Sequence, residues 1–222
     1  LYLNRRPSRG ILTNPGSFLI KWSEFVKKTY QNKWKDWHQT LSERNNERWA
    51  AIASQAEVGV EFVNPLKLCM EINSHIEEHD IIIADGGDFV ATASYILKPR
   101  SLNGWLDPGV FGTLGVGAGF ILGARLTHPE SVVWAIYGDG AFGYSLIEFD
   151  TFARHNIPTI AIIGNDARWS QIARDQVEIL HDPISTELAA TDYHNAVEAL
   201  GGKGYFIDNI NQVNDVLIQA KE

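Results

Sequence analysis

Short runs of apolar residues recur along the chain from residue 64 onward, and segments with helical spacing lie between them. The continuous apolar runs predict strands at 81–84, 132–137, 157–163 and near 204–207. The segments with helical spacing predict helices at 66–78, 141–154, near 191–200 and at 211–220. Fully apolar strands that alternate with helices are typical of a parallel sheet with helices on both faces. The pattern therefore predicts an α/β fold.

Residues 1–60 follow a different pattern, which predicts helices and no strands. After the turn signal Asn14-Pro15-Gly16-Ser17, apolar residues recur at helical spacing, and a second helical run spans 33–56. The second run carries tryptophans among charged residues, and such a stripe is more often a packing surface than a nucleic-acid or membrane surface. Residues 1–50 hold ten Lys or Arg against four Asp or Glu, and residues 51–222 hold nine against twenty-three. We expect a helical linker segment at 1–60 and an α/β domain at 61–222.

Composition narrows the function classes further. The net charge of −8 argues against nucleic-acid binding, which needs a basic face. Cys69 is the single cysteine, so the chain forms no internal disulfide and we expect a reducing compartment. The longest uncharged stretch, 108–124, contains six glycines and is too short for a membrane span. Because residue 1 is Leu and the only methionine is Met70, we expect a piece of a longer chain.

Polar clusters follow three of the predicted strands. They are Asp85-Gly86-Gly87-Asp88, Gly138-Asp139-Gly140 and Asn165-Asp166. Neighbouring parallel strands lie about 4.8 Å apart, so Asp139 and Asp166 are expected to approach each other. Two close carboxylates repel each other unless a cation lies between them, and Mg²⁺ prefers such oxygen ligands. The predicted helix after Gly140 offers N–H groups to an anion. Together these features predict a site for a phosphorylated cofactor that is bound through Mg²⁺.

Each of these features also has a simpler interpretation. Asp139 and Asp166 are also consistent with helix caps, and Gly-Asp-Gly is a common turn. The glycines of 112–119 have spacing like a dinucleotide loop, but a tightly packed helix start explains them equally well. A metal-dependent phosphohydrolase would need further ligands near the aspartates, for which His155 and His181 are the candidates.

The segment from Gly138 to Asp166 resembles the Gly-Asp-Gly…Asn-Asn signature of thiamine diphosphate-dependent enzymes. Residues 109–119 resemble the Gly-Thr-Met-Gly segment of the same enzymes, and the nearest resemblance is to the acetolactate synthase-like and 2-hydroxyacyl-CoA lyase group. The resemblance covers roughly residues 60–222, which would form the C-terminal, diphosphate-binding domain. Residues 1–60 resemble the end of the central domain and its connection.

The resemblance implies a role for individual positions. It implies that Mg²⁺ is held by Asp139, by Asp166 and by the backbone carbonyl of Arg168. It also implies thiamine diphosphate contacts at Gly87, Asp88, Phe89, Gly112, Leu114, Gly138, Asp139, Gly140, Ala141 and Asp166. Leu114 would support the bent cofactor from below, and Gly140 and Ala141 would offer N–H groups to its diphosphate. At Asp166 the family usually has Asn, so the site gains a negative charge.

The activity that the resemblance implies is cleavage of a 2-hydroxyacyl-CoA to an aldehyde and formyl-CoA, with the cofactor as electron sink. The alternatives are a carboligase that acts on pyruvate, as acetolactate synthases do, and a non-catalytic homologue that serves as an assembly module. In the family, the activating glutamate lies in an N-terminal domain and the active site forms between subunits. We therefore assign no catalytic residue here and expect a homo-oligomer, a dimer or tetramer. The compartment is not determined by this chain; the resemblance suggests the endoplasmic reticulum membrane, through an N-terminal anchor that is not among these residues.

Overall fold

The computed structural model describes residue 4 and residues 6–29 and 34–222, which form two compact units. The first unit, Leu1–Ala51, contains helix α1 (Pro15–Thr29) and most of helix α2 (Lys35–Ala56). The side chain of Asn14 accepts a hydrogen bond from the backbone N–H of Ser17 at 3.0 Å, so the predicted turn also caps α1. The apolar side chains of α1 are exposed within the unit, at Leu19, Ile20, Trp22, Phe25 and Val26.

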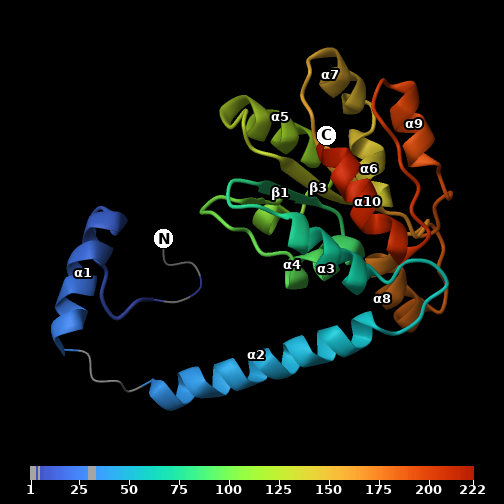
Figure 1. Cartoon of the computed structure of the whole chain (residues 1–222). Helices are drawn as coiled ribbons and strands as arrows, with labels where there is room; N and C mark the ends of the chain where they lie inside the picture. The colour runs from blue at the N-terminus through green and yellow to red at the C-terminus, as the bar shows by residue number, and fades with distance from the viewer. Residues whose placement is uncertain (1–3, 5, 30–33) are drawn as a thin grey trace. The chain divides into compact units, whose positions relative to one another are not determined.

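The second unit, Ile52–Glu222, is a sheet with helices on both faces (Figure 1). Its strands are β1 (Ile81–Asp85), β2 (Trp105–Leu106), β3 (Val133–Gly138) and β4 (Ile160–Gly164). Its helices are α3 (Pro65–His75), α4 (Asp88–Ile96), the 3-10 turn η1 (Gly109–Phe111), α5 (Gly117–Thr127), α6 (Asp139–Ser145), α7 (Glu148–Arg154), α8 (Ser170–Leu180), α9 (Tyr193–Ala199) and α10 (Ile210–Lys221).

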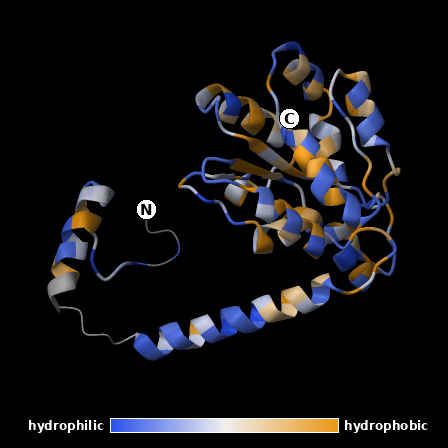
Figure 2. Ribbon diagram, viewed as in Figure 1, coloured by the Kyte–Doolittle hydropathy of each residue, from blue (hydrophilic) through white to orange (hydrophobic). Residues whose placement is uncertain are grey.

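The four strands are parallel and lie in the order β2-β1-β3-β4. Alternate residues of each strand point to opposite faces, which gives the unit two apolar cores. On one face, Ile83 and Ala135 pack with α5, α6 and α7. On the other face, Ile82 and Trp134 pack with α3, α4 and α10. Hydrophobic residues accordingly gather on the strands in Figure 2, and the predicted α/β fold is confirmed.

Two predicted elements differ from the sequence-based expectations. The segment 204–207 is not a strand, because Gly204 lies directly against the backbone of His194 in α9, where a side chain would come within 2.2 Å of the His194 carbonyl oxygen. Phe206 in this segment stays 64% exposed. The predicted helix 141–154 is two helices, because the chain turns at residues 146–147 between α6 and α7. In the part of the chain that the structure describes, no helix is long and apolar enough to cross a membrane.

Candidate functional site

Three polar segments meet at the carboxyl end of the sheet. Asp85 ends β1 and pairs in register with Tyr137 of β3, and Gly138 of β3 pairs in register with Gly164 of β4. The predicted clusters after these strands are therefore neighbours in space. This edge is where ligands bind in open parallel sheets, because the loops that leave the strand ends diverge there.

Asp139 lies at the first position of α6 and is 3% exposed. Its carboxylate accepts hydrogen bonds from the backbone N–H of Gly140 at 2.8 Å and of Arg168 at 3.3 Å. The hydroxyl of Tyr193 donates to the Asp139 carbonyl oxygen at 3.1 Å, which fixes the backbone at this point. Burial raises the pKa of the Asp139 carboxyl, and the charge of Asp166 raises it further, while the N–H donors lower it. The negative charge of Asp166 therefore disfavours ionisation of the Asp139 carboxyl.

Asp166 is the second residue of the loop that follows β4 and, unlike Asp139, is exposed. Its carboxylate accepts a hydrogen bond from the hydroxyl of Ser170, the first residue of α8. The next residue, Ala167, has a left-handed backbone with φ of 53°, and its carbonyl accepts a bond from the N–H of Leu188 at 2.7 Å. This turn brings the N–H of Arg168 to Asp139, so the loop after β4 and the start of α6 form one structure.

Glycine is required at Gly140 in α6 and at Gly164, the last residue of β4, by the aromatic rings that cover them. A Cβ atom at Gly140 would lie 2.4 Å from the ring of Trp169, and a Cβ atom at Gly164 would lie 2.4 Å from the ring of Phe89. Phe89, which the resemblance assigns to the cofactor, therefore packs its ring against the end of β4. Gly138 and Ala141 lie beside Asp139, as the chain connectivity dictates.

The loop after β1 and the loop before α5 border a pocket of about 310 Å³. Gly87 and Gly112, both predicted cofactor residues, line it together with Trp105 of β2 and Gln171 of α8. Asp88 starts α4 and forms an ion pair with Arg174 of α8 across this edge. The pocket thus lies between two of the four segments to which the sequence analysis assigned cofactor contacts.

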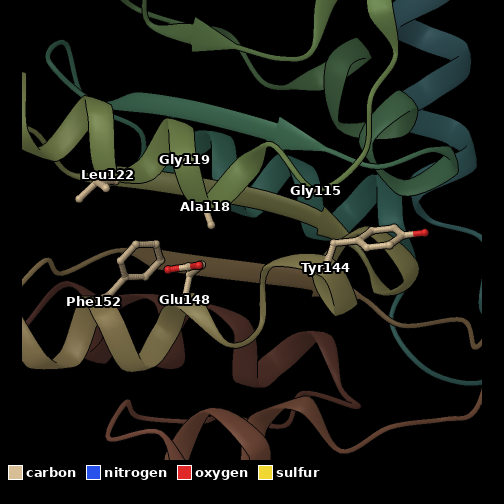
Figure 3. A pocket seen from close by; sticks show the side chains of 7 residues that line it. All are labelled: Gly115, Ala118, Gly119, Leu122, Tyr144, Glu148 and Phe152. Carbon is tan, nitrogen blue, oxygen red and sulfur yellow. The ribbon is translucent and has the colours of Figure 1, made fainter.

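Leu114 does not line that pocket; it is half-buried and packs against the core on the α5 face. A second pocket of about 280 Å³ lies between α5, α6 and α7 (Figure 3). Phe152 and Glu148 of α7 point toward Ala118 and Leu122 of α5 there. None of the predicted site residues lines this second pocket.

Sequence reasoning missed several residues at the site. Asp85 is fully buried and bonds to the backbone before α5, and Tyr193 reaches Asp139 from a helix far along the chain. Three further residues border the strand ends: Trp169, which directly precedes α8, and Gln171 and Arg174, which lie in it. The sequence analysis did not predict α8. The Asp-Gly-Gly-Asp cluster was the one available signal for Asp85.

Comparison with known proteins agrees with the resemblance to thiamine diphosphate-dependent enzymes. Residues 85–222 match the family described as thiamine pyrophosphate enzyme, C-terminal TPP binding domain. The chain is 46% identical to 2-hydroxyacyl-CoA lyase 2 of Danio rerio, over 98% of this chain and 35% of that protein. It is 43% identical to 2-hydroxyacyl-CoA lyase 2 of Homo sapiens, over 98% of this chain and 34% of that protein. The chain thus spans about a third of the length of these relatives.

Two further similarities are more distant. The chain is 35% identical to the acetolactate synthase large subunit of Mycobacterium tuberculosis, over 71% of this chain and 29% of that protein. Its fold is similar to that of a solved structure, the thiamine diphosphate-dependent 4-hydroxybenzoylformate decarboxylase of Rhodococcus jostii. The TM-score is 0.67 at 20% identity, over 74% of this chain and 31% of that one. At that identity, the second similarity concerns the fold alone.

Proposed function

The chain belongs to the family of thiamine pyrophosphate enzymes and carries their C-terminal TPP-binding domain, and from this premise we propose that the full-length protein is a carbon–carbon lyase. The lyase depends on thiamine diphosphate and Mg²⁺ and cleaves a 2-hydroxyacyl-CoA to an aldehyde and formyl-CoA. The observation that carries this proposal is the 43–46% identity to 2-hydroxyacyl-CoA lyase 2 proteins over nearly the whole chain. When bound, thiamine diphosphate supplies the electron sink for bond cleavage.

The donor atoms at the end of the sheet fit a hard divalent cation. Asp139 is buried next to the charge of Asp166, and a cation between the two carboxylates offsets both the burial and the repulsion. Among the described residues, no three His, Cys, Asp or Glu side chains are grouped so that they could hold a metal ion. Mg²⁺ is commonly held by one or two carboxylates with other oxygen ligands, and we assign the backbone carbonyl of Arg168 as a further ligand, as the resemblance implies.

The surroundings also fit a phosphorylated cofactor. Gly86 lies so close to Gly138 that a Cβ atom would come within 2.7 Å of the Gly138 nitrogen, so two strand-end loops approach each other through bare backbone. The pocket lined by Gly87 and Gly112 offers room beside these loops. We assign to Gly87, Asp88, Phe89, Gly112, Leu114, Gly138, Gly140 and Ala141 the task of binding and orienting the cofactor. No catalytic residue is assigned in this chain, and we propose that another part of the longer protein completes the site in a homo-oligomer.

The test uses the full-length protein with thiamine diphosphate, Mg²⁺ and a long-chain 2-hydroxyacyl-CoA. Mass spectrometry detects formyl-CoA and the shortened aldehyde. We expect Asp139→Ala to reduce product formation by more than about 100-fold, because even residues that only support a metal ligand are worth roughly 10- to 100-fold. Asp150→Ala is the matched control: Asp150 pairs with Arg154 on α7 and lies outside the proposed ligand set.

The outcomes separate the alternatives. Full activity of Asp139→Ala contradicts the metal assignment. Cofactor binding without products from 2-hydroxyacyl-CoA redirects the search to pyruvate, because the similarity to an acetolactate synthase favours a carboligase as the second candidate. Absence of cofactor binding by the full-length protein favours a non-catalytic homologue.

A further inference from the structure

Asp85 is the last residue of β1, and its side chain has no exposed surface. Both carboxylate oxygens accept a hydrogen bond from the backbone N–H of Gly115, at 3.0 and 3.1 Å. One of them also accepts from the N–H of Gly117, at 2.8 Å. The carboxylate therefore joins the end of β1 to backbone that lies 30 and 32 residues further along the chain.

This contact supplies hydrogen-bond acceptors for backbone N–H groups at the start of α5. The N–H groups in the first turn of a helix have no partner within the helix, and Val116 at the N-cap makes no side-chain capping bond. Asp85 supplies the missing acceptor from another element, and its negative charge lies at the positive end of the helix dipole. Burial raises the pKa of the Asp85 carboxyl, and the bonds from Gly115, Val116 and Gly117 lower it.

The bonded segment is also enclosed from the other side. Gly115 has φ of 89°, and a Cβ atom there would lie 2.9 Å from the Cβ of Tyr144, its neighbour in Figure 3. A Cβ atom at Gly117 would lie 2.5 Å from the hydroxyl oxygen of Tyr137. Residues 115–117 are thus held between Asp85 and aromatic side chains of β3 and α6. Leu114 directly precedes this segment, so the same contacts restrict where its backbone lies.

We propose that Asp85 is a positioning residue of the cofactor site: by binding the N–H groups of Gly115 and Gly117, it places Leu114 for contact with thiamine diphosphate. The inference rests on the proposed function, which assigns Leu114 to the cofactor. The hydrogen bonds of the Asp85 carboxylate go to Gly115 and Gly117 and not to the proposed metal ligands, so Asp85 acts through the backbone that it holds.

The test measures the dissociation constant of thiamine diphosphate in the presence of Mg²⁺ by calorimetry, with the full-length protein. Asp85→Asn keeps the size of the side chain but replaces one acceptor oxygen with an NH₂ group that faces N–H donors. We expect the dissociation constant to rise by at least about tenfold, which corresponds to about 1.4 kcal/mol.

Asp80→Asn is the matched control. Asp80 lies just before β1, is 4% exposed, and accepts bonds from the Trp134 indole at 2.8 Å and the Glu77 N–H at 3.0 Å. The Asp80→Asn substitution makes the same chemical change at the opposite end of β1. We therefore expect it to lower the stability of the protein and to leave the dissociation constant of thiamine diphosphate unchanged. Equal weakening of cofactor binding by both variants would mean that Asp85 has a merely structural role.

Two further measurements test the route through Leu114. Because residues that act together are not additive, Leu114→Ala should weaken cofactor binding less in the Asp85→Asn protein than in the wild type. If Asp85→Asn does not fold, hydrogen exchange of the wild-type protein replaces it. The Gly115 and Gly117 amides should be protected even without cofactor, and exchange as fast as in an open loop overturns the proposal.

The calorimetry distinguishes a failure of the proposed function from a failure of the inference about Asp85. A wild-type protein that does not bind thiamine diphosphate overturns the proposed function and this inference together. A wild-type protein that binds it, with an Asp85→Asn variant that binds equally well, overturns this inference alone.

Discussion

At the scale of single residues, buried polar side chains mark the two ends of the central strands. Asp80 and Ser131 precede β1 and β3, and Asp85 and Asp139 lie at or just after their carboxyl ends. Asp80, Asp85 and Asp139 each accept hydrogen bonds from N–H groups, so their burial is compensated. The two acids at the carboxyl ends lie beside segments to which we assign the cofactor, and the acid at the amino end serves as an anchor for Trp134.

Cys69 provides a test of burial at the same scale. It lies in α3 without exposed surface, and burial raises the pKa of its thiol to about 12. Only the thiolate reacts as a nucleophile. We therefore expect no reaction of the folded 222-residue chain with Ellman's reagent at pH 8, and complete reaction of its single cysteine after unfolding in guanidinium chloride. A Cys69→Ala chain should give no signal in either state. Rapid reaction of the folded chain would show that α3 is not packed as described.

At the scale of elements, the helices fit the sheet through specific close contacts. The ring of Phe89 in α4 occupies the space where a side chain at the last residue of β4 would project. The ring of Trp169, just before α8, does the same at Gly140 in α6. Because protein interiors are close-packed, such contacts determine how near each helix lies to the sheet.

Gly164→Ala tests the contact between α4 and β4. The new Cβ atom would lie 2.4 to 2.8 Å from atoms of Phe89, so we expect a loss of about 1–3 kcal/mol in the free energy of unfolding. Urea denaturation measures this loss. Phe89→Ala should cost less stability in the Gly164→Ala chain than in the wild type, because the double change also removes the clash.

The matched control for this substitution is Gly123→Ala in α5. No atom lies within 4 Å of a Cβ at that position, and alanine is the better helix former, so stability should rise by up to about 1 kcal/mol. A destabilisation of similar size at both positions would contradict the packing argument.

At the scale of the whole molecule, the compact α/β unit begins earlier than the family match. The match starts at residue 85, but the unit starts at Ile52, near the end of α2. Ile52 and Ala56 are each 2% exposed, and Ile52 belongs to the core shared with α3, α4 and α10. The final turn of α2 is therefore part of this unit. The domain boundary near residue 60 stays a prediction.

Two truncated chains test this view. A chain of residues 52–222 keeps Ile52, and we expect it to unfold at the same urea concentration as the second unit of the whole chain. A chain of residues 61–222 lacks Ile52, and deletion of a buried side chain of this size costs about 2–5 kcal/mol. Equal stability of the two truncated chains would show that the end of α2 adds nothing to the core.

The chain's local pattern was sufficient to predict the α/β class and three of the four strands. β1 and β3 are buried along nearly their whole length and β4 is largely half-buried, yet each contains a continuous apolar run that is visible without knowledge of its neighbours. The strand-end clusters around Asp139 and Asp166 were visible for the same reason, and their resemblance to a known signature indicated the family. The assigned roles of these residues stay predictions.

Only the tertiary structure decided the features that depend on partners far along the chain. The two-residue strand β2 exists because it pairs with β1, and 204–207 does not form a strand because it packs against α9 instead. Asp85 gains its role from N–H groups 30 and 32 residues away, and Gly140 is constrained by the ring of Trp169. A sequence shows the period of its apolar residues directly, but such contacts arise only when the fold brings distant segments together.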